Sequence, residues 1–204
     1  MFSSNISLRI QSVSIEGSET FFDAIHVDSN GKSFTFKGIV SRAINLEVGK
    51  NYLAINAVPK NYDGDAHCKH LYFDPRSTLI ECGNESVNNV LIIGRTTEQA
   101  KQSNGIKGEK AWYLSRFNII SNTNYYDKEY VDQRTQKAGG NPPFSLQCEY
   151  WNKFPAMPKG NQYIVSGQLI SSVSTDNKEY FNVRVSDMGF GAESSNNAST
   201  RKAA

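Results

Sequence analysis

The sequence is poor in the residues on which most catalytic sites depend. Of its 204 residues, only three are cysteine and three are histidine. Cys68, Cys82 and Cys148 are an odd number without the spacing of a disulfide framework, which favours a reducing compartment. No serine–histidine–aspartate order, phosphate-binding loop, dinucleotide fingerprint or HExxH motif occurs. The sequence therefore predicts neither an enzyme nor a bound cofactor.

One polar cluster raises the question of a metal site. It is His67-Cys68-Lys69-His70, with Asp63 and Asp65 a few residues before it. Zinc sites need four ligands, usually from paired Cys-x-x-Cys or His-x-x-x-His spacings. This cluster has one cysteine and no second pair, so a polar hairpin loop is the better interpretation and no metal is expected.

Long apolar runs and a strong charge of one sign are also absent. No stretch is long enough to span a bilayer, and Met1–Ile10 does not have the form of a signal peptide. The net charge is only +2, so the chain lacks the broad cationic field of many nucleic-acid binders, and any basic surface must be local. We expect a soluble, cytoplasmic protein without a membrane partner.

Aromatic residues, by contrast, are plentiful. The apolar share of 38% is low, yet there are 10 tyrosines and 11 phenylalanines. Aromatic side chains are favoured in β-sheets and also form surfaces on which bases stack. The composition thus points to an all-β protein.

The first half of the chain has the pattern of a small barrel. Residues 6–15 alternate apolar and polar positions with one slip between Ile10 and Val13, which predicts a strand with a bulge. Ser29-Asn30-Gly31 predicts a hairpin turn. The remaining expected elements are strands over 20–27 and 32–40, one helical turn over 42–48, a strand from Asn51, a polar loop around 63–65 and a strand over 77–82. Five strands with a short helix after the third follow the order of an OB-fold.

The second half predicts a second barrel of five strands. These strands are expected over residues 87–97, 111–122, 145–153, 161–173 and 178–188, with polar loops over 97–110 and 124–143 and a turn at Asp176-Asn177. Gly167 lies inside the fourth strand and predicts a bulge. Leu146, Cys148 and Tyr150 fall on one strand face and Trp151 on the other.

The two halves also align with each other. Gly49 can be placed on Gly160 and Tyr52 on Tyr163, with apolar residues following in both copies, and an internal duplication is the simplest explanation. We expect domains over residues 1–83 and 84–191, joined by a short junction. The polar tail, residues 192–204, is expected to be disordered.

Residues 88–190 resemble the bacterial single-stranded-DNA-binding protein family, whose domain is an OB-fold. The matching pieces are Asn89-Val90-Leu91-Ile92-Ile93-Gly94-Arg95-Thr96, Cys148-x-x-Trp151-x-Lys153, Lys159-Gly160-x-Gln162 with Gly167-Gln168-Leu169, and Val185-x-Asp187. The resemblance implies an OB-fold that binds and protects single-stranded DNA in replication, recombination or repair, in a bacterial, plasmid or phage context. Together with the strand order of the first half, it leads us to expect two tandem OB-folds. Family members commonly combine four OB-folds, which two chains of this kind would supply as a homodimer.

Trp151 is the first candidate for stacking on a base. It faces away from Leu146, Cys148 and Tyr150, it is followed by Lys153, and the resemblance places an aromatic residue of the binding face here. The alternative is a tryptophan buried in a contact between domains or subunits. Stacking tolerates any sequence, because every base has a π-face.

The long loop after the second strand supplies a second group of candidates. Tyr125, Tyr126 and Tyr130 alternate there with Lys128 and Arg134, as in a clamp that closes over a strand. The alternative is a hairpin whose tyrosines pack on each other.

Further candidates follow the strands of the second barrel. The resemblance implies that Arg95 contacts phosphate. The others are Trp112, Arg116, Lys159, Lys178, Tyr180 and Arg184, although each charge taken alone is typical of an ordinary surface.

Two departures from the family bear on function. The helix between strands three and four is reduced to Phe154–Pro158, which is too short and too rich in proline to be helical. The chain ends in ASTRKAA, whereas family members usually end in an acidic tip that recruits other proteins. The competing hypotheses are an OB-fold protein–protein adaptor without nucleic-acid binding, and an RNA-binding protein.

Overall fold

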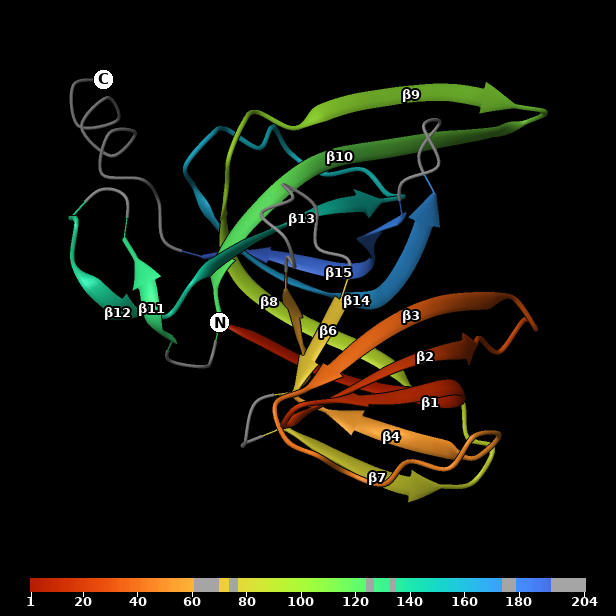
Figure 1. The fold of residues 1–204 in the computed structure, drawn as a ribbon. Helices are drawn as coiled ribbons and strands as arrows, with labels where there is room; N and C mark the ends of the chain where they lie inside the picture. The colour runs from red at the N-terminus through yellow and green to blue at the C-terminus, as the bar shows by residue number, and fades with distance from the viewer. Residues whose placement is uncertain (61–69, 74–76, 124–126, 133–134, 174–178, 192–204) are drawn as a thin grey trace.

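The computed structural model describes residues 1–60, 70–73, 77–123, 127–132, 135–173 and 179–191. Regular structure in these ranges is strand throughout. No helix among them is long and apolar enough to cross a bilayer. The strands build two barrels that lie against each other (Figure 1). The chain is an all-β protein of two tandem OB-folds, as the strand pattern predicted.

The first barrel is built from strands β1 to β7. These are β1 (Phe2–Glu16), β2 (Glu19–Val27), β3 (Ser33–Val40), β4 (Asn51–Ile55), β5 (Val58–Lys60), β6 (His70–Phe73) and β7 (Thr78–Cys82). β4 and β5 are two pieces of one barrel strand, separated where Asn56 takes a positive φ of 57°. β6 pairs parallel with β3 and antiparallel with β5, and β4 pairs with both β1 and β7, which completes the circuit.

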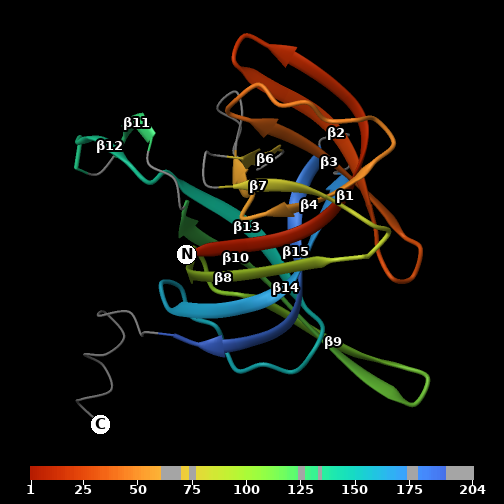
Figure 2. The same cartoon turned by 90° about the horizontal axis from the view of Figure 1, so that it is seen from below.

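The second barrel has the same circuit with longer strands. Its strands are β8 (Asn88–Thr96), β10 (Lys110–Asn122), β13 (Pro143–Tyr150), β14 (Gln162–Val173) and β15 (Glu179–Phe190). β13 and β15 are the parallel pair, and β8 closes the barrel between β14 and β10. Two hairpins extend from it at opposite ends of the molecule, β9 (Lys101–Lys107) with β10, and β11 (Asp127–Val131) with β12 (Ala138–Gly140) (Figures 1 and 2).

A strand shared between the barrels joins them. The start of β1, Phe2–Ile6, pairs with β8 along Asn88–Ile92, while Asn5–Arg9 pairs with β4 on the other edge. Aromatic contacts reinforce the joint, because the Phe2 ring meets Phe144 with centroids 5.2 Å apart. The two barrels are therefore joined by main-chain hydrogen bonds as well as by side-chain packing.

Several local predictions are confirmed. The slip in the first strand is a bulge, since the β1–β2 register shifts between Ile10 and Ser12. The β14–β15 register shifts between Ser166 and Gly167, where a Cβ on the glycine would overlap the carbonyl oxygen of Arg184. The alternation along β13 also holds, because Leu146 and Cys148 are buried and Trp151 is exposed.

The predicted helical turn over residues 42–48 is wrong. The segment is irregular because side chains satisfy its backbone: the Ile44 N–H donates to the Thr20 hydroxyl at 2.9 Å, and the Glu47 N–H donates to the Tyr52 hydroxyl at 3.1 Å. The two segments expected to be polar loops, 97–110 and 124–143, contain the strands of the two hairpins.

Some predictions fall outside the described residues. These are the polar loop over 63–65, most of the histidine–cysteine cluster, the turn at Asp176-Asn177 and the tail. Within the part of the chain that is described, no three histidine, cysteine or acidic side chains gather as they would around a metal ion.

Candidate nucleic-acid interface

The β9–β10 hairpin sorts its side chains by charge onto two faces. Its register pairs Lys107 with Lys110, Gly105 with Trp112, Ser103 with Leu114, and Lys101 with Arg116. Because paired residues share a face and successive residues alternate, these eight residues belong to the same side of the hairpin. We call this side the basic face. The opposite side is uncharged and carries Gln102, Asn104, Ile106, Ala111, Tyr113 and Ser115.

The indole of Trp112 lies over Gly105, which is its cross-strand partner on the basic face. A Cβ on Gly105 would lie 2.8 Å from three atoms of the indole. Only a glycine at this position lets the ring rest directly on the β9 backbone, where its other side remains available to solvent. Residue Trp112 is 36% exposed in spite of this support.

The second tryptophan of the chain joins the first. Trp151 follows the end of β13 on the outward side, and its ring centroid is 6.2 Å from that of Trp112 with an angle of 50° between the ring planes. Trp151 is 57% exposed as a residue, so it remains largely open to solvent beside Trp112. Two neighbouring, partly open indoles are what a stacking surface for bases requires.

A row of charged side chains crosses the sheet beside the indoles. Cross-strand pairs place Lys101, Arg116, Glu149 and Arg184 side by side on β9, β10, β13 and β15. Arg116 Nε donates to Glu149 Oε1 at 2.8 Å, and half of the arginine side chain is exposed. The row therefore contains three cations and one carboxylate. On β10, Trp112, Leu114 and Arg116 follow one another along the same face.

The predicted site residues do not form one surface. Trp112, Trp151, Arg116 and Arg184 lie near one another, and Lys153 is exposed directly after Trp151. Tyr125, Tyr126, Arg134 and Lys178 lie outside the described residues. Tyr180 is half-buried at the start of β15 and has interactions of its own.

The other candidates lie toward the far end of β10. Arg95 pairs in register with Ile120, eight residues or about 26 Å along the strand from Trp112. Its guanidinium donates to the Gly160 carbonyl at 2.7 Å, next to the exposed Lys159. Lys128 and Tyr130 belong to the β11–β12 hairpin, which extends from the opposite end of the barrel (Figure 2). The structure thus separates these four residues from the tryptophans.

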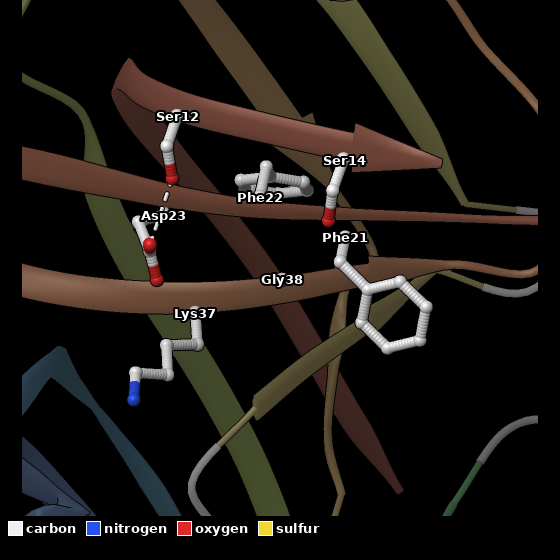
Figure 3. A pocket seen from close by; sticks show the side chains of 7 residues that line it. All are labelled: Ser12, Ser14, Phe21, Phe22, Asp23, Lys37 and Gly38. Carbon is white, nitrogen blue, oxygen red and sulfur yellow. Dashed lines mark hydrogen bonds between the residues drawn. The ribbon is translucent and has the colours of Figure 1, made fainter. Parts of the chain in front are cut away.

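The first barrel presents a different outer surface at β1, β2 and β3. A hollow of about 170 Å³ lies there, and in it the Ser12 hydroxyl donates to Asp23 at 2.7 Å. Figure 3 shows the side chains that line it. Lys37 and the ring of Phe21 complete its rim. Asp23 and Lys37 are the charged residues that line this hollow, and their charges are opposite. No tryptophan lines it, so it lacks the features of the basic face.

The sequence prediction missed part of the basic face. The sequence pattern assigns Lys101, Gly105, Lys107 and Lys110 to a polar loop, and it gives no signal that Glu149 belongs to the site. The sequence offers only a weak signal for the hairpin: Gly108-Glu109 can form a two-residue turn, but neither KQSNGIK nor KAWYLSR alternates polar and apolar residues.

Comparisons with known proteins agree with the fold. No protein-family model and no curated protein sequence matches the chain. Among solved structures, the single-stranded DNA binding protein from Thermus aquaticus matches with a TM-score of 0.56 and 12% sequence identity, covering 95% of this chain and 93% of that one. A deletion mutant of the same protein matches with a TM-score of 0.57 and 12% identity, covering 95% and 96%. In its fold, the chain is therefore similar to a single-stranded DNA binding protein along nearly its whole length.

Proposed function

We propose that the chain binds single-stranded DNA without sequence specificity, chiefly through the basic face and Trp151. The observation that carries this proposal is the pair of open indoles beside Lys101, Lys107, Lys110 and Arg116. Each base stacked on an aromatic ring contributes about 1–3 kcal/mol, and lysine and arginine supply the salt-dependent attraction for phosphates. The similarity in fold to the Thermus protein supports the same class of ligand.

The wider proposal concerns biological role and assembly. We propose that the chain protects single strands during replication, recombination or repair in a bacterial or phage-infected cell, and that two chains associate to combine four barrels. The domain division at residues 83 and 84 belongs to this proposal, with the first barrel acting mainly as a structural partner. Light scattering on the purified protein would give the number of chains per particle, and a monomer would contradict the dimer.

Tryptophan fluorescence tests the binding directly. Titration with oligo(dT) should quench the emission of Trp112 and Trp151, because both indoles lie on the proposed contact surface. If the four cations of the basic face each meet a phosphate, the logarithm of affinity should fall against the logarithm of salt with a slope of about −3. The absence of quenching and of complex formation at low salt would contradict DNA binding. Oligo(U) in competition would separate a preference for DNA from one for RNA.

A protein–protein adaptor is the second candidate, and one observation favours it. The back of the β9–β10 hairpin is uncharged, and Ile106 there is 77% exposed. An exposed apolar side chain on a projecting hairpin is suited to a protein contact. This alternative predicts that the chain does not bind oligo(dT) but does form a complex with another protein. Ile106→Lys should abolish that complex.

A further inference from the structure

Glu149 occupies an unusual place within the charged row. Its cross-strand neighbours are Arg116 on one side and Arg184 on the other, and Lys101 lies beyond Arg116. The carboxylate is bonded to Arg116 at 2.8 Å, and about a quarter of the glutamate side chain is exposed. Glu149 is thus the one carboxylate within the cross-strand row of Lys101, Arg116 and Arg184.

Glu149 also lies close in register to the tryptophans. Glu149 precedes Trp151 by two residues on the outward side of β13, and Arg116 faces the same side as Trp112. Arg116 pairs with Glu149, so it lies near Trp151 in register, and a nucleotide whose base rests on Trp151 would direct a phosphate toward Arg116. Phosphate and carboxylate prefer the same forked donors of arginine, so both cannot hold the same N–H groups at once.

We infer that Glu149 is an internal competitor for phosphate, which makes binding at this surface depend on base stacking as well as on charge. The inference rests on the proposed function. A ligand with unpaired bases gains stacking on Trp112 and Trp151, which offsets displacement of the carboxylate. A duplex or another polyanion presents phosphates without open base faces, so it meets the repulsion of Glu149 without that gain.

Glu149→Gln tests the inference, because the amide keeps the size of the side chain and removes its charge. Fluorescence anisotropy should measure the affinity of wild type and variant for labelled oligo(dT) and for a duplex of equal length. We expect the variant to bind oligo(dT) about two- to fivefold more tightly, as the loss of an exposed ion pair allows. The gain for duplex should be larger, because a duplex carries the higher density of phosphate charge and is repelled more strongly by Glu149, so the ratio of single-strand to duplex affinity should fall.

A matched control is available on the first barrel. Lys50 and Glu47 form an ion pair of 2.9 Å between exposed side chains, and Glu47→Gln changes the net charge by the same amount. This control should leave the affinity ratio of the wild type unchanged. If Glu47→Gln lowers the affinity ratio as much as Glu149→Gln does, the total charge of the protein determines the ratio, and not the position of Glu149 in the row. That result would overturn the inference.

A double-mutant cycle with Arg116→Ala gives the second test. Glu149→Gln should lose most of its effect when Arg116 is absent, because the two residues act through one contact. Unchanged or weaker binding by Glu149→Gln in the wild-type background would mean that Glu149 positions Arg116 for the ligand, and would overturn the inference while leaving DNA binding intact. If the wild type itself fails to bind oligo(dT), the proposed function falls, and the inference falls with it.

Discussion

Gly49 and Gly160 make the same hydrogen bond in the two barrels. The Gly49 N–H donates to the carbonyl of Ile10 on β1 at 2.9 Å, and the Gly160 N–H donates to the carbonyl of Thr96 on β8 at 2.9 Å. Both glycines have positive φ, 88° and 85°, and each ends the turn before the fourth strand of its barrel. The weak sequence alignment of these two glycines thus corresponds to an equivalence in space.

Replacing either glycine with alanine should destabilise the protein by a similar amount. A side chain in the left-handed region costs about 1–2 kcal/mol, and no atom lies within 4 Å of a Cβ placed on Gly49, so strain of the backbone alone would act there. Urea unfolding of Gly49→Ala and Gly160→Ala measures the loss. A change in the free energy of unfolding close to zero in either variant would contradict the requirement for a left-handed residue.

Neighbouring residues on the β9–β10 hairpin should differ sharply in their effect on DNA binding. Trp112→Ala and Trp151→Ala should each weaken oligo(dT) binding by about 1–3 kcal/mol. Tyr113 is a matched control, since it is 39% exposed but lies on the uncharged side of the same hairpin. Tyr113→Ala should leave the affinity unchanged. Equal losses at Trp112 and Tyr113 would mean that the hairpin does not bind DNA by the basic face.

The side chain of Asn88 continues the ladder between β8 and β14. Its Nδ2 donates to the carbonyl of Leu169 at 2.7 Å, and its Oδ1 accepts the Leu169 N–H at 2.9 Å, in a buried environment. Asn88→Ala should lower the free energy of unfolding by about 2–4 kcal/mol, because two buried backbone groups lose their partner. Asn89→Ala, at the adjacent exposed position, should change it little. Chemical unfolding of both variants checks this contrast.

Asp28 should contribute stability that acid removes. Its carboxylate accepts the N–H groups of Lys32 and Asn30, each at 2.9 Å. The pKa of Asp28 is lowered, chiefly by the hydrogen bond from Lys32, with Asn30 and the positive charge of Arg184 acting in the same direction. A lowered pKa means that the contribution is complete above the unfolded value of about 4 and is lost as the pH falls through the folded value.

Asp28→Asn tests this dependence on pH. The variant should be less stable than wild type near neutral pH, and the difference should shrink as the pH falls below about 4. Unfolding curves at several pH values measure the gap. A difference that stays constant down to the acid limit would contradict a role for the charge of the carboxylate.

Strand alternation predicted the barrel, but it predicted the interface only in part. Leu146 and Cys148 mark the inner face of β13, which correctly placed Trp151 outside. The β9 strand was not predicted because KQSNGIK contains lysine, serine, asparagine and glycine, which are uncommon in strands. The hairpin forms nevertheless, since its partner strand β10 continues out of the barrel core and supplies a template.

Grouping the site residues required three-dimensional information. Trp112 and Lys128 are close in sequence, yet they lie toward opposite ends of β10, because a strand advances about 3.3 Å with each residue. Trp112 and Trp151 are distant in sequence and meet through the β10–β13 pairing. Sequence alone also could not show that Thr20 and Tyr52 satisfy the backbone of residues 44–47, which explains why no helix forms there.

The start of β1 should make the two barrels a single cooperative unit, because Phe2–Ile6 pairs with β8 and Asn5–Arg9 pairs with β4. If heating detaches the start of β1 from β4, β8 loses its pairing with β1 as well. Neither barrel should therefore unfold while the other keeps all of its strand pairs. We expect scanning calorimetry to show one endotherm for the whole chain rather than two. Oligo(dT) held by the second barrel should then raise the melting temperature of the first barrel as well, because ligand linkage acts on everything that unfolds together.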